Sequence, residues 1–151
     1  MNIVQYLLKE VLRPLQTSNI YHHLFKQRRR MKQIIIDLDN TITIHSDKPY
    51  SEMTPNLDVI SMLRHYKKQG FGIVIHTARN MRTYENNVGK IVANTVPVII
   101  DWLARHDVPY DEIRVGKPWC GKGGFYVDDK AIRPDEFVNL GYDEILDIID
   151  G

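Results

Sequence analysis

The stretch Ile34-Ile35-Ile36-Asp37-Leu38-Asp39-Asn40-Thr41 decides the fold that we expect for this chain. Its three consecutive β-branched apolar residues predict a buried parallel strand over 33–37. Two carboxylates stand where this strand ends, and in open α/β sheets ligands bind beyond the carboxyl ends of the strands. Desolvating two carboxylates is costly, so we expect a metal cation or a chemical role to compensate. A surface turn rich in Asp and Asn is the alternative interpretation.

The length and composition predict one soluble domain with an appendage. The chain has 151 residues, of which 43% are hydrophobic and 26% are charged. Its single cysteine, Cys120, allows no intrachain disulfide, which suits a reducing compartment. No apolar run approaches the ~20 residues of a membrane span. Lys9, Glu10 and Arg13 interrupt any signal-peptide core. We therefore expect a cytoplasmic protein without a transmembrane segment.

A change in charge at Met31 divides the chain into two segments. Residues 1–30 carry six Lys or Arg and one Glu, a net charge of +5, which leaves −4 for residues 31–151. Apolar residues between 4 and 15 recur at three- and four-residue steps and predict an amphipathic helix. This basic extension is expected to dock on its own domain or mediate homo-oligomer formation. A membrane-surface contact, or a natural start at Met31 with a weakly ordered extension before it, are the alternatives.

From Met31 onward, strand and helix patterns alternate as in a doubly wound parallel sheet, so the fold class expected for 31–151 is α/β. A helix is expected over 56–69, with Leu57, Ile60, Leu63 and Tyr66 inward and Gly70 as its stop. A second buried strand follows over 71–76. A helix over 87–106 should break near Pro97, where Thr95 can cap the next piece. Short strands at 113–115 and 124–127 and a final helix at 142–149 complete the pattern.

Each predicted strand ends in a polar signature. His76-Thr77-Ala78-Arg79 follows the second strand, Gly116-Lys117-Pro118 the third, and Asp128-Asp129 the fourth. Because carboxyl ends of parallel strands share one edge of a sheet, a carboxylate, a hydroxyl, a cation and an acidic pair should meet there.

In this order the four signatures resemble the motifs of the haloacid dehalogenase superfamily of phosphohydrolases, over Met31 to about Pro134. The segments Thr77–Tyr84 and Gly116–Gly121 further resemble a small subgroup labelled capsular or surface-polysaccharide biosynthesis phosphatases. The resemblance implies a fold of the Rossmann type. It also implies a phosphorylated small molecule or glycan precursor as the substrate.

The chemistry implied by this resemblance assigns a role to each signature. Asp37 would be the nucleophile, forming an aspartyl-phosphate. Mg²⁺ would be bound by Asp37, the Asp39 carbonyl and Asp128, with Asp129 binding directly or through water. Thr77 and Lys117 would stabilise the transferring phosphoryl group. Asp39 would protonate the leaving group and then activate water. The expected substrate-binding residues are Thr77, Arg79, Lys117 and Asn40.

The acid at position 39 favours a phosphatase or phosphomutase over a dehalogenase or a transport ATPase. A mutase needs a large cap, and neither residues 42–55 nor the interval from Thr77 to Lys117 leaves room for one, so we expect an open, capless site. Residues 1–30 are a candidate lid.

Three other functions remain as alternatives. A phosphatase of nucleic-acid ends or nucleotides would use Arg28–Arg30 as a phosphate-binding arm, although nucleic acid is not the expected partner. A phosphorylatable receiver domain uses a similar residue set, but there the acidic pair comes first in the chain. A non-catalytic scaffold is the third alternative.

Overall fold

The computed structural model describes residues 32–151. The chain divides into two units, Met1–Lys32 and Gln33–Gly151, and the second unit contains every strand and helix of the described residues. The predicted amphipathic helix, the basic Arg28–Arg30 and the alternative start at Met31 lie outside the described residues.

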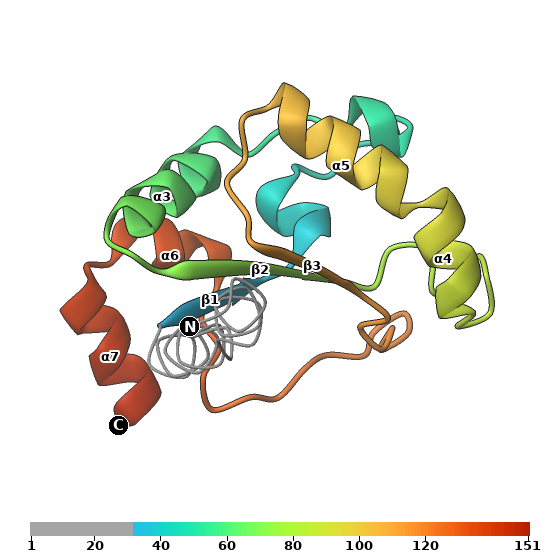
Figure 1. Ribbon diagram of the computed structural model, residues 1–151. Coiled ribbons are helices and arrows are strands. Elements are labelled where there is room, and N and C mark those ends of the chain that lie inside the picture. Colours follow the sequence, from blue (N-terminus) through green and yellow to red (C-terminus); the bar gives the residue numbers. More distant parts are fainter. Residues whose placement is uncertain (1–31) are drawn as a thin grey trace, which may run out of the picture. The chain divides into compact units, whose positions relative to one another are not determined.

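The described residues form a mixed α/β unit built on a parallel three-stranded sheet. The strands β1 (Gln33–Ile36), β2 (Gly72–Thr77) and β3 (Glu112–Val115) lie in the order β1-β2-β3. Ile36 pairs with Ile75, and Thr77 pairs with Val115. The carboxyl ends of all three strands therefore share one edge (Figure 1). The α/β class and the parallel sheet predicted from the sequence are confirmed.

Two helices, α3 (Leu57–Lys68) and α5 (Val96–Arg105), cover one face of the sheet (Figure 1). The core between these layers is formed mainly by apolar residues of β2, α3 and α5, which include Ile60, Leu63, Tyr66, Ile73, Ile75, Trp102 and Leu103. The prediction for Leu57 was wrong, because this side chain is 68% exposed at the first position of α3. Gly70 follows the end of α3 by two residues and has a positive φ of 88°, as expected of a helix stop.

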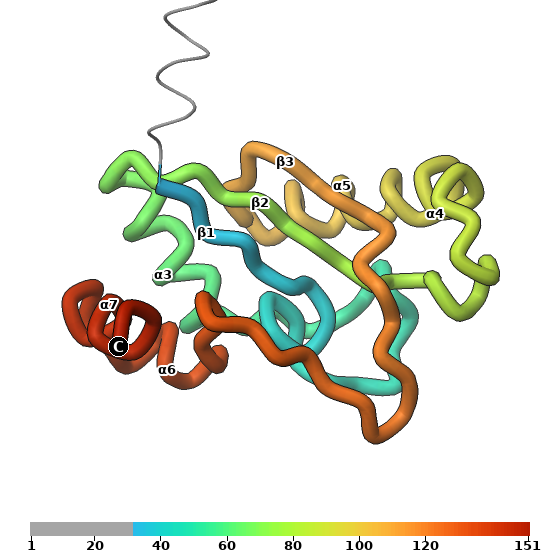
Figure 2. The backbone as a smooth tube through the Cα atoms, turned by 90° about the horizontal axis from the view of Figure 1, so that it is seen from below, coloured from blue at the N-terminus to red at the C-terminus, as the bar shows by residue number. Residues whose placement is uncertain are grey.

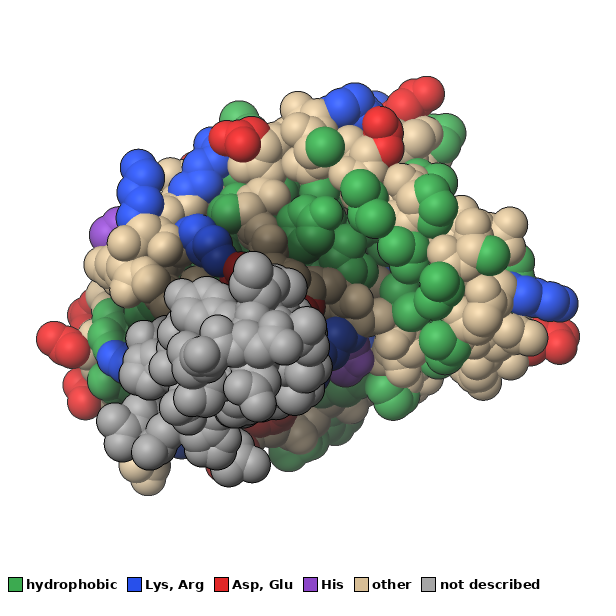
Figure 3. Space-filling view, viewed as in Figure 1, with side chains coloured by type: hydrophobic (Ala, Val, Ile, Leu, Met, Phe, Trp, Pro, Cys, Tyr) green, Lys and Arg blue, Asp and Glu red, His purple; other side chains and the backbone are tan. Residues whose placement is uncertain are grey.

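The predicted helix over 87–106 is two helices, α4 (Val88–Asn94) and α5. Thr95 stands between them, but its side chain does not cap α5, contrary to our expectation. Instead, the Thr95 hydroxyl donates a hydrogen bond to Asn80 Oδ1 over 2.9 Å and fastens this junction to the loop after β2. Hydrophobic side chains gather on the surface near α4 and α5 (Figure 3), and the exposed ones include Val88, Val92 and Ile100.

The predicted strand over 124–127 is absent, which corrects the sequence interpretation. Residues 116–133 form an extended excursion that leaves the end of β3 and returns to α6 (Pro134–Asn139) and α7 (Tyr142–Asp150) (Figure 2). A tight turn reverses the chain at Gly121–Gly124, where the Gly124 amide donates to the Gly121 carbonyl over 3.3 Å. A Cβ on Gly124 would lie 2.0 Å from the Cys120 carbonyl oxygen, so only glycine fits.

The first strand is less buried than its three isoleucines predict. Ile36 is 7% exposed, whereas Ile35 is 61% exposed. Within residues 32–151, β1 forms an edge of the sheet because no strand follows on its far side. From Lys32 to the C-terminus, no helix has the length and apolarity needed to cross a bilayer.

Candidate active site

The ends of β1, β2 and β3 bring Asp37, Thr77 and Lys117 to one place. The Lys117 amide donates to the Thr77 carbonyl over 3.2 Å and continues the pairing of β2 with β3. The Lys117 Nζ then lies 3.4 Å from the Asp37 Oδ1, and these side chains are 19% and 33% exposed. The predicted proximity of position 37 to position 117 is therefore found, and it follows from the parallel register of the sheet.

The Asp37 carboxylate sits in a partly buried position next to the Lys117 ammonium group. Burial raises the pKa of Asp37, while the Lys117 ammonium and the Leu38 backbone hydrogen bond act in the opposite direction. A raised pKa at a residue that lies at the carboxyl edge of an α/β sheet marks a candidate functional group.

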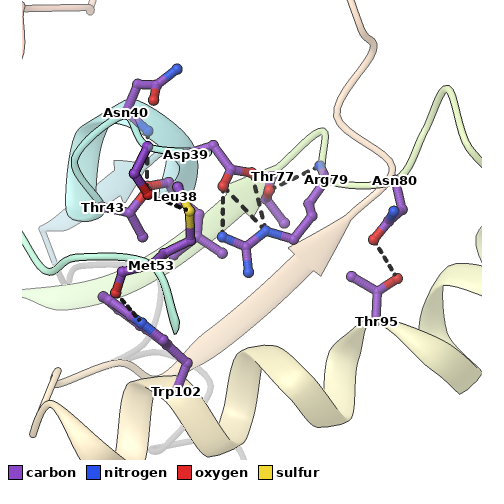
Figure 4. A network of polar contacts seen from close by, with 11 residues as sticks. Leu38, Asp39, Asn40, Thr43, Met53, Thr77, Arg79, Asn80, Thr95 and Trp102 are labelled. Carbon is purple, nitrogen blue, oxygen red and sulfur yellow. Dashed lines mark hydrogen bonds and ion pairs between the residues drawn. The ribbon is translucent and has the colours of Figure 1, made fainter. Parts of the chain in front are cut away.

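Arg79 holds the second carboxylate of the motif. Its Nη2 donates to Asp39 Oδ1 over 2.6 Å, and its Nε contacts both oxygens at 3.1–3.2 Å (Figure 4). The Arg79 side chain is 1% exposed, and Asp39 is 29% exposed. The Tyr50 ring covers the guanidinium, with Cζ 4.3 Å from the ring centroid. In this arrangement Arg79, expected to bind substrate, contacts Asp39 and fixes the orientation of its carboxylate.

The turn that presents Asp39 is built by Thr43. The helical turn η1 (Leu38–Ile42) follows Asp37, and the Leu38 carbonyl accepts bonds from both the Thr43 amide (3.0 Å) and its hydroxyl (3.3 Å). The Asn40 amide donates to the Thr43 hydroxyl over 3.2 Å. Asn40, expected to bind substrate, is exposed with a φ of 59° (Figure 4). Asn tolerates this left-handed conformation better than most residues.

Thr77 is fully buried at the end of β2. Its hydroxyl accepts a hydrogen bond from the Arg79 amide over 3.0 Å, which shapes the loop that carries Arg79 (Figure 4). The sequence predicted a contact between this hydroxyl and a phosphoryl group. That contact stays a prediction; in the structure the Thr77 hydroxyl supports the residue that orients Asp39.

The acidic pair does not join this group. Asp128 and Asp129 are exposed on the excursion, and Asp128 Oδ1 accepts a bond from the Lys130 amide. Between residues 32 and 151, the structure places no three His, Cys, Asp or Glu side chains where they could hold a metal ion. The expected ligand set of Asp37, Asp39, Asp128 and Asp129 is therefore not assembled, because the strand that should carry the pair is absent.

Two aromatic residues that sequence reasoning did not select lie at the site. Tyr50 covers Arg79, and the Tyr126 ring lies 4.5 Å from the Lys117 Nζ. The Tyr126 hydroxyl also donates to the Pro118 carbonyl. Neither residue stands in a periodicity or motif that reveals its position. Tyr50 begins the short helix η2 (Tyr50–Glu52), and Tyr126 lies in the extended segment after the turn at Gly121–Gly124.

A cavity of about 210 Å³ lies on the α4–α5 side of the Arg79 loop. It is lined by Tyr50, Ser51, Asn80, Tyr84, Asn94, Thr95 and Val98. Tyr50 therefore contributes to both the cavity and the cover of Arg79. The cavity is lined by aromatic and polar side chains, and Tyr50 links it to the ion pair of Arg79 with Asp39.

Comparison with known proteins identifies one informative relative. No family model and no curated protein matches the chain. A crystal structure of a structural-genomics target from Vibrio cholerae is 55% identical, with a TM-score of 0.77, and the match covers 80% of this chain and 98% of that one. The chain therefore belongs to the same family as this Vibrio cholerae protein.

Proposed function

We propose that the chain is a phosphomonoester hydrolase that forms an aspartyl-phosphate on Asp37. The observation that carries this proposal is the 3.4 Å approach of Lys117 Nζ to Asp37 Oδ1 at the shared carboxyl edge of β1 and β3. A carboxylate nucleophile needs a fixed cation beside it, because it must approach a dianionic phosphate. The resemblance to haloacid dehalogenases, and with it a doubly wound fold, is part of the proposal.

Two steps would follow from the positions of the protein groups. An Asp37 oxygen bonds to phosphorus while the bond to the leaving alkoxide breaks, and protonated Asp39 gives that alkoxide its proton. Asp39 then takes a proton from water, whose oxygen attacks phosphorus and releases inorganic phosphate from Asp37. Arg79 is a positioning residue in this scheme, since its bonds hold the Asp39 carboxyl group in one orientation.

Mg²⁺ belongs to the proposal through the sequence resemblance. When bound, such a cation neutralises charge on the carboxylate and the phosphate. Within one copy, however, residues 32–151 do not assemble a set of ligands for it, since the Asp128–Asp129 pair is exposed on the excursion. The two steps above are therefore described only by the parts that Asp37 and Asp39 take in them.

The cavity that Tyr50 connects to the Arg79–Asp39 pair supports a sugar or polyol phosphate as substrate, as expected for surface-polysaccharide biosynthesis. Tyr50 and Tyr84 offer faces on which a sugar ring can stack, and Asn94 offers an amide that can bind hydroxyl groups.

The direct test is a phosphatase screen with sugar phosphates, nucleotides and an aryl phosphate, with and without Mg²⁺. Asp37→Asn should abolish turnover while the circular dichroism spectrum stays unchanged. Asp101→Asn is the matched control, because Asp101 lies in an exposed pair with Arg105 on α5. Full activity of Asp37→Asn would refute the proposed nucleophile, and a preference for nucleotides would replace the sugar assignment.

A further inference from the structure

The described unit has two exposed apolar features that complement each other. The first is the outer edge of β1, where Ile35 is 61% exposed. The second is the extended segment 124–127, where Phe125 is 80% exposed and Val127 is 89% exposed. Long apolar edges are templates for pairing with another strand, and soluble proteins rarely leave them open.

The sequence of 124–127 has the character of a strand. Gly-Phe-Tyr-Val places two aromatic residues and one β-branched residue in a row, and an acidic pair follows directly. The same order occurs at β1, where three isoleucines precede Asp37. If the two segments paired in parallel, with Val127 beside Ile36, Asp128 would stand beside Asp37.

This pairing is difficult within one copy. Only residues 116–123 connect the end of β3 to the segment, and they include the tight turn at Gly121–Gly124. To lie parallel to β1, the segment must cross three strand spacings and return by one strand length, about 19 Å in the plane of the sheet. The connection must also rise over a face of the sheet. Parallel crossovers normally use a dozen or more residues, whereas this one has eight.

The course of the chain agrees with this restriction. Both views show residues 125–132 running in the direction opposite to β1 on their way to α6 (Figures 1 and 2). Local contacts also hold the start of the segment beside β3, since Tyr126 contacts Pro118 and lies over Lys117. Three residues beyond the segment, Lys130 Nζ lies 2.7 Å from Asp150 Oδ1 at the end of α7.

We infer that segment 124–127 of one copy adds as a fourth parallel strand to β1 of a second copy. Exchange of an identical element is a low-cost route to symmetric assemblies, because each copy offers both the donor and the acceptor. The exchange would bury Phe125, Val127 and the edge of β1. Its consequence for the site rests on the proposed function: the second copy's Asp128 would be the missing carboxylate beside Asp37.

A disulfide test reports the pairing without any assay of activity. In a Cys120→Ser background, Ile35→Cys with Tyr126→Cys places thiols on neighbouring strands at one level of the proposed register. After mild oxidation, a band of two linked chains on a non-reducing gel is expected. A linked single chain would show pairing within one copy and overturn the inference, as would no link. Ile35→Cys with Val92→Cys is the control, because Val92 is exposed on α4 and should give no link.

Complementation tests the shared site. Asp37→Asn and Asp128→Asn are each expected to be inactive, yet the two chains co-expressed at equal levels should regain about one quarter of wild-type activity. Half of the copies that accept a segment then contain Asp37, and half of the donated segments contain Asp128. One site in four therefore has both carboxylates. No recovery, with wild type active, would refute sharing. An inactive wild type with a link between chains would refute the proposed function and leave the exchange standing.

Discussion

Arg79 holds both carboxylate oxygens of Asp39, with nitrogen–oxygen distances of 2.6–3.2 Å, from a position that is 1% exposed. The pair joins the end of β1 to the loop after β2 and lies under Tyr50. Planar, bidentate contacts of this kind fix geometry as well as charge. Arg79 therefore has two effects that can be measured separately: it stabilises the fold, and it fixes the orientation of Asp39.

Replacing Arg79 by methionine should lower the free energy of unfolding by on the order of 2 kcal/mol, because a partly buried carboxylate loses its partner. Urea denaturation measures this change. Arg79→Lys should keep more of the stability but lose the bidentate geometry, so its kcat/KM should fall about 10²-fold. Arg114→Met is the control, since Arg114 forms an exposed pair with Glu112 and its loss should change stability by roughly 0–1 kcal/mol. Equal effects at positions 79 and 114 would contradict this role.

Asp37→Asn should make the protein more stable at neutral pH. Burial raises the pKa of Asp37 in the folded state, so folding favours its protonated form. The wild type then loses stability as pH rises through the folded pKa, whereas the amide cannot ionise. The gain of the variant should be greatest above the folded pKa and disappear below the ordinary aspartate pKa. Thermal unfolding from pH 3 to pH 8 measures the difference, and a gain that is the same at every pH would contradict it.

Thr77→Val should destabilise the loop that carries Arg79. The valine has nearly the same shape but removes the acceptor of the Arg79 amide, and a buried donor without a partner costs about 1–3 kcal/mol. Thr77→Ser keeps the acceptor and loses only a methyl group, which costs about 1 kcal/mol. Denaturant unfolding of both variants separates these effects. A serine variant that is less stable than the valine variant would show that packing matters more than the hydrogen bond.

Much of the sheet could be predicted from the sequence because its signals are local. The apolar residues before Asp37 and Thr77 indicate the strands, and the register of parallel strands then brings Asp37 toward Lys117. Asn56 and Gly70 bound α3 with side-chain and backbone chemistry that a short window contains.

The parts that could not be predicted depend on tertiary contacts. Gly-Phe-Tyr-Val at 124–127 has strand propensity, but the turn at Gly124 and a connection of eight residues keep it from the sheet of its own copy. The place of Arg79 on the loop after the second strand predicts a substrate contact, which stays a prediction. Its burial against Asp39 depends on Tyr50, a residue of the short helix η2 far away in the sequence. No local pattern indicates either outcome.

Tyr84→Ala should change substrate selection more than turnover. Tyr84 lines the cavity beside the Arg79 loop, so its loss removes a stacking surface for a bulky leaving group. The KM for a sugar phosphate should rise about 10-fold, in keeping with the roughly 0.5–1.5 kcal/mol of one aromatic contact. The kcat should stay nearly constant, because Asp37, Asp39 and Lys117 keep their contacts. For a small aryl phosphate that does not fill the cavity, both constants should stay close to wild type, and an equal rise in KM for both substrates would show that the cavity binds no leaving group.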